Sequence, residues 1–161
     1  MKKVTAAEKA QVKKLVKMCI RLLKKKQYEL ALPKNAADIA LEVLEVKKRL
    51  NTPSRAGADL IRINLEYWQM ENPIATEYAA FNDDPVIGKI EVTDRDDQLL
   101  VMVAHEVAHH IQFRHCPKVA RFKKNYRKPH GDCFKAIYRY LRRDLVNPMI
   151  EARREEILQA A

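Results

Sequence analysis

Residues 103–111 read Val-Ala-His-Glu-Val-Ala-His-His-Ile and contain the pattern HExxH. In a helix, a spacing of four residues brings His105 and His109 one turn apart on one face, with about 5–6 Å between their Cβ atoms. Both imidazoles can then reach one metal ion, and they leave positions for a third ligand and a water molecule. The stretch therefore predicts a metal-binding helix, and the rest of the chain is interpreted around it.

We expect this helix to be long and buried beneath the site. Thr93 or Asp94 can cap its start, and Pro117 follows its expected end near Arg114. A solvated surface helix with scattered histidines would not be apolar around the motif. The apolar residues there are Val103, Ala104, Val107, Ala108 and Ile111.

Glu106 follows the first of the two histidines, where a carboxylate can act as a general base. It can take a proton from a metal-bound water and later deliver it to the leaving amine. Nitrogen ligands and tetrahedral geometry favour one zinc ion, and zinc lowers the pKa of its bound water towards about 7. The motif therefore predicts hydrolysis by a zinc-bound water that Glu106 activates.

The third ligand has several alternatives, which are three further histidines and the downstream carboxylates. His110 lies about 100° around the helix from His109 and should point elsewhere. His115 lies just past the expected helix end, so helical geometry gives no reason for it to meet the other two. His130 is favoured because it precedes an amphipathic helix that can pack against the first, and Gly131 would let the backbone turn sharply there.

The same motifs resemble a known family. HExxH is followed about twenty residues later by His-Gly-x-x-Phe at residues 130–134, and this pair resembles the SprT-like (Spartan-type) zinc metallopeptidases. Two upstream stretches, residues 55–57 and 88–93, look like the short strands of that family, so the resemblance covers roughly residues 35–145. It implies a compact zincin-like domain in which the HExxH helix packs on a second ligand-bearing helix beside a small β-sheet. It also implies a protein substrate at or near DNA, because some members cleave proteins crosslinked to DNA.

Two helices are predicted before the sheet. Thr5-Ala-Ala-Glu8 reads as a capping box at the start of a basic amphipathic helix that ends near Lys26. Asn35 can cap a second helix, whose apolar face continues at helical spacing to Leu50. The period then changes from helical to alternating, which marks the start of the sheet.

Strand signals lie in the middle of the chain. Residues 60–68 predict a strand, residues 77–81 are a weaker strand candidate, and residues 82–85 predict a turn. Residues 86–92 predict another strand, which is our candidate for the edge that pairs with an extended peptide substrate. An ordinary sheet strand is the alternative for that segment.

The C-terminal third is helical again. A helix is predicted from about Gly131 to Leu145, and Asn147-Pro148 predicts a break before a short charged helix. Helices, a small sheet and further helices make an α+β chain. We divide it into a basic N-terminal helix at 1–30, the metallopeptidase domain at 31–146 and the terminal helix at 147–161.

Charge is distributed unevenly along the chain, whose net charge is +10. Residues 1–26 hold ten Lys and Arg residues and one acid, and this surface suits nucleic acid, a membrane or an acidic protein equally. A solvated surface is the alternative. Phe122 and Tyr126, in the connector after the motif, are interpreted either as stacking platforms for bases or as core anchors. The cations of that connector, our candidates for nucleic-acid contacts, are Lys118, Arg121, Lys123, Lys124, Arg127 and Lys128.

Cysteine usage and hydropathy indicate the compartment. Cys19, Cys116 and Cys133 are odd in number and widely spaced, which predicts three reduced thiols. No apolar run approaches the roughly 18 residues needed to span a bilayer, and the first residues lack the apolar core of a signal peptide. We therefore expect a cytoplasmic protein.

These observations predict a zinc metalloendopeptidase with one zinc ion on His105, His109 and His130 and with Glu106 as the catalytic base. The alternative is a non-catalytic nucleic-acid-binding protein in which the same ligands hold a structural zinc. Glu106 favours the enzyme, because a structural site needs no base and is usually closed by a fourth protein ligand. The two downstream cysteines are candidates for that fourth ligand. Hydrolysis of a non-peptide substrate is a third interpretation.

Overall fold

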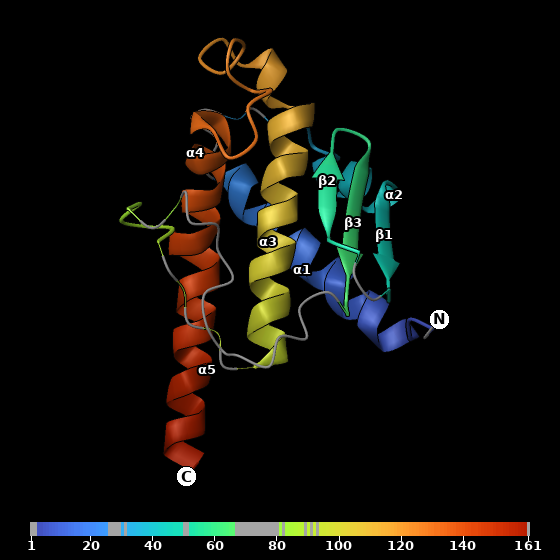
Figure 1. The fold of residues 1–161 in the computed structure, drawn as a ribbon, viewed down its shortest axis with the longest axis vertical. Helices are drawn as coiled ribbons and strands as arrows, with labels where there is room; N and C mark the ends of the chain where they lie inside the picture. Colours follow the sequence, from blue (N-terminus) through green and yellow to red (C-terminus); the bar gives the residue numbers. More distant parts are fainter. Residues whose placement is uncertain are drawn as a thin grey trace.

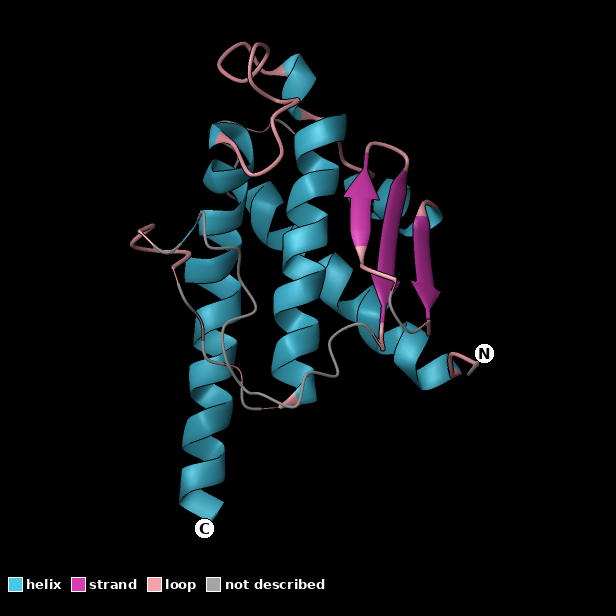
Figure 2. Ribbon diagram, in the orientation of Figure 1, coloured by secondary structure: helices cyan, strands magenta, loops and turns pink. Residues whose placement is uncertain are grey.

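The computed structural model describes residues 3–25, 30, 32–49, 52–66, 81, 83–88, 90, 92 and 94–160. The elements are α1 (Ala6–Lys25), α2 (Ala36–Glu42), β1 (Leu44–Lys47), β2 (Arg55–Gly57), β3 (Leu60–Asn64), α3 (Arg95–Arg114), η2 (Cys116–Lys118), α4 (Asp132–Leu141), η3 (Arg142–Val146) and α5 (Asn147–Ala160). Helix α3 stands at the centre, with the small sheet on one side and α4 and α5 on the other (Figures 1 and 2). This arrangement confirms the α+β class.

The first helix begins at a capping box, as predicted. The backbone N–H of Thr5 donates to Glu8 Oε2 at 2.8 Å, and the N–H of Glu8 donates to Thr5 Oγ1 at 3.2 Å. The apolar face of α1 packs against α3 and belongs to the same hydrophobic core. Its buried residues are Val12, Leu15, Val16, Cys19, Ile20 and Leu23.

The second helix is shorter than predicted. It starts after Asn35, as expected, but it ends at Glu42 and gives way to strand β1. The prediction that the helix continues to Leu50 is wrong, because β1 pairs in parallel with β3, with Leu44 opposite Ile61. Pairing between distant strands has overridden a local helical pattern.

The described residues form a three-stranded sheet in the order β1-β3-β2. Strand β3 confirms the first part of the strand predicted at residues 60–68, and β2 pairs with it in antiparallel fashion, with Ala56 opposite Ile61. Ile61 and Ile63 are fully buried, as their alternation with Arg62 predicts. The weaker strand candidate at residues 77–81 lies outside the described residues except for Phe81.

The strand predicted at residues 86–92 is wrong for the described part of that segment, because residues 86–88 form a turn and bend and neither Ile90 nor Val92 lies in a strand. The carboxylate of Asp84 accepts hydrogen bonds from the N–H groups of Val86 and Ile87, at 3.1 and 3.0 Å. Gly88 follows with a φ of 39°, a left-handed conformation that glycine adopts without strain. The amides of Val86 and Ile87 are therefore satisfied locally and not by a sheet, while the pairing of this segment with a peptide substrate stays a prediction.

The helices around the motif follow the predicted bounds more closely. Asp94 caps α3 by accepting from the N–H of Asp97 at 2.8 Å, and α4 begins just after Gly131. The break predicted at Asn147-Pro148 is wrong, because the π-helical segment η3 (Arg142–Val146) joins α4 to α5 in one long rod that continues through both residues (Figure 1). Pro148 is the second residue of α5, a position near a helix start where a proline is tolerated.

Candidate metal centre

Three histidines meet between α3 and the start of α4. The Nε2 atom of His130 lies 3.1 Å from His105 Nε2 and 3.0 Å from His109 Nε2. All three offer ligand atoms within 4.8 Å of one another. His105 and His109 lie one turn apart on α3, as their spacing predicts, and the chain returns to bring His130 against them. These three histidines are close enough to hold a metal ion.

The backbone at His130 is unusual. Its φ is 56°, and among the described residues no other non-glycine residue has a positive φ. This conformation costs an ordinary side chain about 1–2 kcal/mol. Gly131 has a φ of −78°, so it is His130 and not Gly131 that makes the sharp turn. Gly131 is needed for a different reason, because a Cβ there would lie 3.1 Å from the carbonyl oxygen of Lys128.

Phe134, the aromatic residue of His-Gly-x-x-Phe, supports all three histidines. Its ring centroid lies 4.9 Å from that of His105, 4.3 Å from that of His109 and 4.9 Å from that of His130. The side chain is fully buried. No role for Phe134 follows from the HExxH pattern, although its place three residues after Gly131, on the first turn of α4, is a signal that it faces the same site.

The donor set fits a metal ion. A neutral imidazole carries one hydrogen on one of its two nitrogens, so the Nε2 of His130 can make one good hydrogen bond. It nevertheless lies within hydrogen-bonding distance of both other Nε2 atoms. A cation between them would be bound by all three lone pairs. Burial, and next the nearby His105, lower the pKa of His109 to about 3, so its imidazole is neutral at pH 7, as a metal ligand must be.

Glu106 lies beside this cluster in the chain and is 7% exposed. Its Oε2 atom has no hydrogen-bond partner within the described part of the structure, and burial raises the pKa of the carboxyl to about 8. A buried carboxyl oxygen without a partner is costly, and such groups concentrate at functional sites. A cation nearby would favour the charged carboxylate and lower this pKa.

The two alternative histidines lie elsewhere. His110 donates from Nδ1 to the carbonyl oxygen of Gly57 in β2 at 3.0 Å. Its ring packs edge-on against His115, with 6.2 Å between ring centroids. Burial lowers the pKa of His115 to about 4. Neither histidine belongs to the cluster that the other three form.

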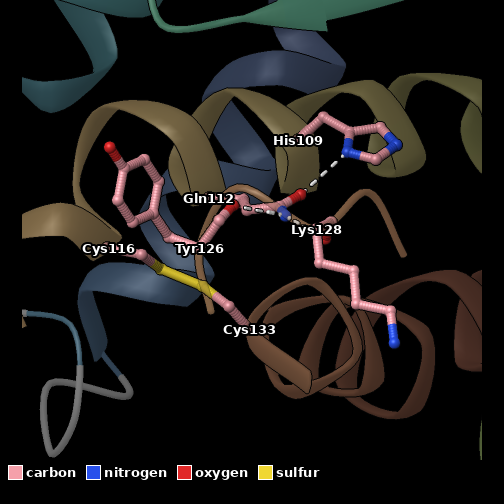
Figure 3. Close-up of a disulfide and its surroundings, with 6 residues drawn as sticks. All are labelled: His109, Gln112, Cys116, Tyr126, Lys128 and Cys133. Atoms are coloured by element: carbon pink, nitrogen blue, oxygen red, sulfur yellow. Dashed lines mark hydrogen bonds between the residues drawn. A yellow bond between two sulfur atoms is a disulfide. The ribbon is translucent and has the colours of Figure 1, made fainter. Parts of the chain in front are cut away.

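The prediction of three reduced cysteines is wrong for two of them. Cys116 and Cys133 form a disulfide that joins η2, just after α3, to the first turn of α4, while Cys19 is a buried free thiol (Figure 3). The sequence separation of 17 between the two cysteines does not predict a disulfide, because only the packing of α3 on α4 brings them together. A disulfide sulfur is not the thiolate that zinc binds, so in this state neither residue serves as a fourth ligand.

The connector between α3 and α4 carries the predicted cations on its surface. Phe122 is 3% exposed and packs in the core, and Tyr126 is half-buried, so both serve as anchors of the loop. The exposed cations are Lys118, Arg121, Lys123, Lys124, Arg127 and Lys128. The connector ends at His130, so these charges belong to the same loop as one histidine of the cluster.

Comparisons of the chain with protein-family models, with curated proteins and with solved structures find no match. The interpretation of the site therefore depends on its own geometry and chemistry. Across the part of the chain that the structure describes, no helix has both the length and the apolar character to cross a membrane.

Proposed function

We propose that this protein is a zinc metalloendopeptidase of the SprT-like kind, with a zincin-like fold. One observation carries the proposal, which is the convergence of the Nε2 atoms of His105, His109 and His130. Two of these belong to HExxH, and the third begins His-Gly-x-x-Phe. Glu106, the residue that the motif provides as a base, follows His105 in the chain and is buried, and its Oε2 atom has no hydrogen-bond partner among the described residues.

The residues divide the chemistry between them. The three imidazoles would hold the ion, and three protein ligands are the number typical of a catalytic zinc site. A bound zinc ion would supply Lewis acidity and lower the pKa of its water from 15.7 to about 7. Glu106 would serve as the general base for that water and as the general acid for the leaving amine, and typical general acid–base catalysis contributes 10²–10⁴-fold to the rate.

A protein substrate at or near DNA is part of the proposal. The resemblance of the paired motifs to SprT-like enzymes supports the peptide substrate. The exposed cations of the connector support the polyanion, because lysine and arginine release counterions when they bind phosphates. Since the connector ends at His130, DNA bound to it would lie close to the proposed catalytic centre.

The first test is zinc stoichiometry by elemental analysis of protein purified without chelators. Wild type is expected to carry about one zinc ion per chain, and His130→Ala should lose it. His115→Ala is the matched control, because His115 is also a buried histidine of the same region but lies outside the cluster, and this variant should keep its zinc. Absence of metal from wild type, or its loss only with His115, would exclude the proposed site.

A second measurement tests the substrate. Hydrolysis of an unstructured protein should be followed with and without single-stranded and double-stranded DNA. Zinc-dependent hydrolysis supports the peptidase, and stimulation by DNA that disappears when the connector lysines are replaced supports the role of DNA. Zinc bound at full stoichiometry with no hydrolysis of any protein would instead favour the structural-zinc alternative.

A further inference from the structure

Gln112 connects one histidine of the cluster to the loop that carries another. It lies on α3 three residues after His109 and is fully buried. Its Oε1 atom lies 2.9 Å from His109 Nδ1, and its Nε2 atom lies 2.8 Å from the carbonyl oxygens of both Tyr126 and Lys128 (Figure 3). One side chain therefore makes three hydrogen bonds in the interior.

The orientation of the Gln112 amide follows from its partners. Backbone carbonyl oxygens only accept hydrogen bonds, so the NH₂ group must face Tyr126 and Lys128. The amide oxygen must then face His109, and this oxygen has no hydrogen to donate, so it can only accept a hydrogen bond. It follows that His109 Nδ1 carries the hydrogen and that its Nε2 carries the lone pair. That lone pair belongs to the nitrogen that faces His130.

The same amide restrains the loop. Lys128 lies two residues before His130, and its carbonyl oxygen also accepts from the N–H of Gly131 at 3.1 Å. The disulfide between Cys116 and Cys133 closes the two ends of the loop, and Gln112 holds its middle (Figure 3). The backbone that carries His130 in its left-handed conformation is thus fixed from both sides.

We propose that Gln112 is a positioning residue of the metal centre, which selects the metal-binding tautomer of His109 and fixes the loop that presents His130. The role in metal binding rests on the proposed zinc site, whereas the selection of the tautomer does not. Partners of this kind behind a histidine ligand orient the ring, and their replacement typically weakens metal affinity 10–100-fold.

The variants separate the two roles of Gln112. Gln112→Leu keeps a similar volume and removes all three hydrogen bonds. Gln112→Glu keeps an acceptor for His109 Nδ1 but can no longer donate to both carbonyl oxygens. Gln11→Leu is the matched control, because Gln11 is exposed and its amide donates to Asp96, far from the histidine cluster in the chain.

Two readouts are measured on each protein. The first is the histidine tautomer of the metal-free protein, from ¹⁵N NMR of histidine-labelled samples. The second is zinc affinity by competition with a chromophoric chelator. Wild type and Gln112→Glu should show His109 protonated at Nδ1, and Gln112→Leu should lose this preference. Zinc affinity should fall 10–100-fold in Gln112→Leu, less in Gln112→Glu, and stay within twofold of wild type in Gln11→Leu.

The outcomes distinguish this inference from the proposed function. A folded Gln112→Leu protein that keeps the Nδ1–H tautomer, or binds zinc as wild type does, overturns the positioning role. If wild type itself binds no zinc, the metal centre fails, while the tautomer measurement still decides whether Gln112 orients His109. If Gln112→Leu does not fold, Gln112→Glu provides the test. Loss of the Nδ1–H tautomer of His109 in Gln112→Glu would then overturn the inference.

Discussion

At the scale of single residues, the proposed chemistry depends on Glu106. Glu106→Gln should retain about one zinc ion and lose hydrolysis by about 10²–10⁴-fold, because the amide cannot accept the proton. The fold should tolerate the change, since burial already raises the pKa of this carboxyl to about 8 and disfavours its charge. Zinc content, urea unfolding and peptide hydrolysis check this together. Hydrolysis at the wild-type rate would remove Glu106 from the mechanism.

Gly131 is the second residue with an individual role. Gly131→Ala should lower the free energy of unfolding by about 1–3 kcal/mol, because the new Cβ would lie 3.1 Å from the Lys128 carbonyl oxygen and from the Lys128 Cβ. Zinc affinity should fall as well, since His130 is adjacent. Gly57→Ala is the control, as a Cβ there meets nothing within 4 Å, and its urea midpoint should barely change. Equal midpoints for the two variants would contradict the proposed contact.

At the scale of elements, the packing of α4 on α3 depends on Phe134. Its ring contacts the rings of His105, His109 and His130, and its side chain is fully buried. Phe134→Ala should cost about 3–5 kcal/mol of stability and weaken zinc binding, because it leaves a cavity behind the ligands. Ile157→Ala, at a site that is 57% exposed on α5, should cost little. Thermal unfolding and zinc titration measure both effects, and an unchanged zinc affinity in a folded Phe134→Ala protein would contradict the supporting role.

The turn that replaces the predicted strand makes stability depend on pH. Burial would raise the pKa of Asp84, but hydrogen bonds from Arg139 and from the Ile87 and Val86 amides outweigh it and lower the pKa from 3.8 to about 2. A lowered carboxyl pKa stabilises the fold fully above pH 3.8, and this contribution is lost as pH falls through about 2.

Asp84→Asn tests this linkage by urea unfolding at a series of pH values. The variant should be less stable than wild type at pH 5–7 by about 1–3 kcal/mol, since Arg139 loses its charged partner. The difference should shrink between pH 4 and pH 2, where Asp84 itself becomes protonated. A difference that stays constant across this range would show that the carboxylate charge does not stabilise the turn.

At the scale of the whole molecule, the disulfide joins η2, the short helix after α3, to the first turn of α4. Reduction of Cys116 and Cys133, which are separated by 17 residues, should lower the free energy of unfolding by about 3 kcal/mol. The physical reason is that the open loop gains more conformational freedom in the unfolded chain than in the folded one. The measurement is urea unfolding with and without reductant. Cys116→Ser/Cys133→Ser is the control, and reductant should not affect its stability.

The sequence by itself determined the parts of the protein that depend on neighbouring residues. The capping box at Thr5, the cap at Asp94 and the helix after Gly131 all appear as predicted, because each depends on contacts within one or two turns. The four-residue spacing of His105 and His109 likewise follows from helix geometry alone. Interactions between residues close in the sequence are sufficient to predict these features.

Only the tertiary structure decided what distant residues do. Strand β1 exists because β3, some 17 residues later, pairs with it, and the turn at Asp84 is held by Arg139 from α4. The disulfide and the three hydrogen bonds of Gln112 also require α3 to lie against α4 and the connector. Periodicity and capping patterns hold no information about these contacts, because their free energy arises only when the packed core brings the partners together.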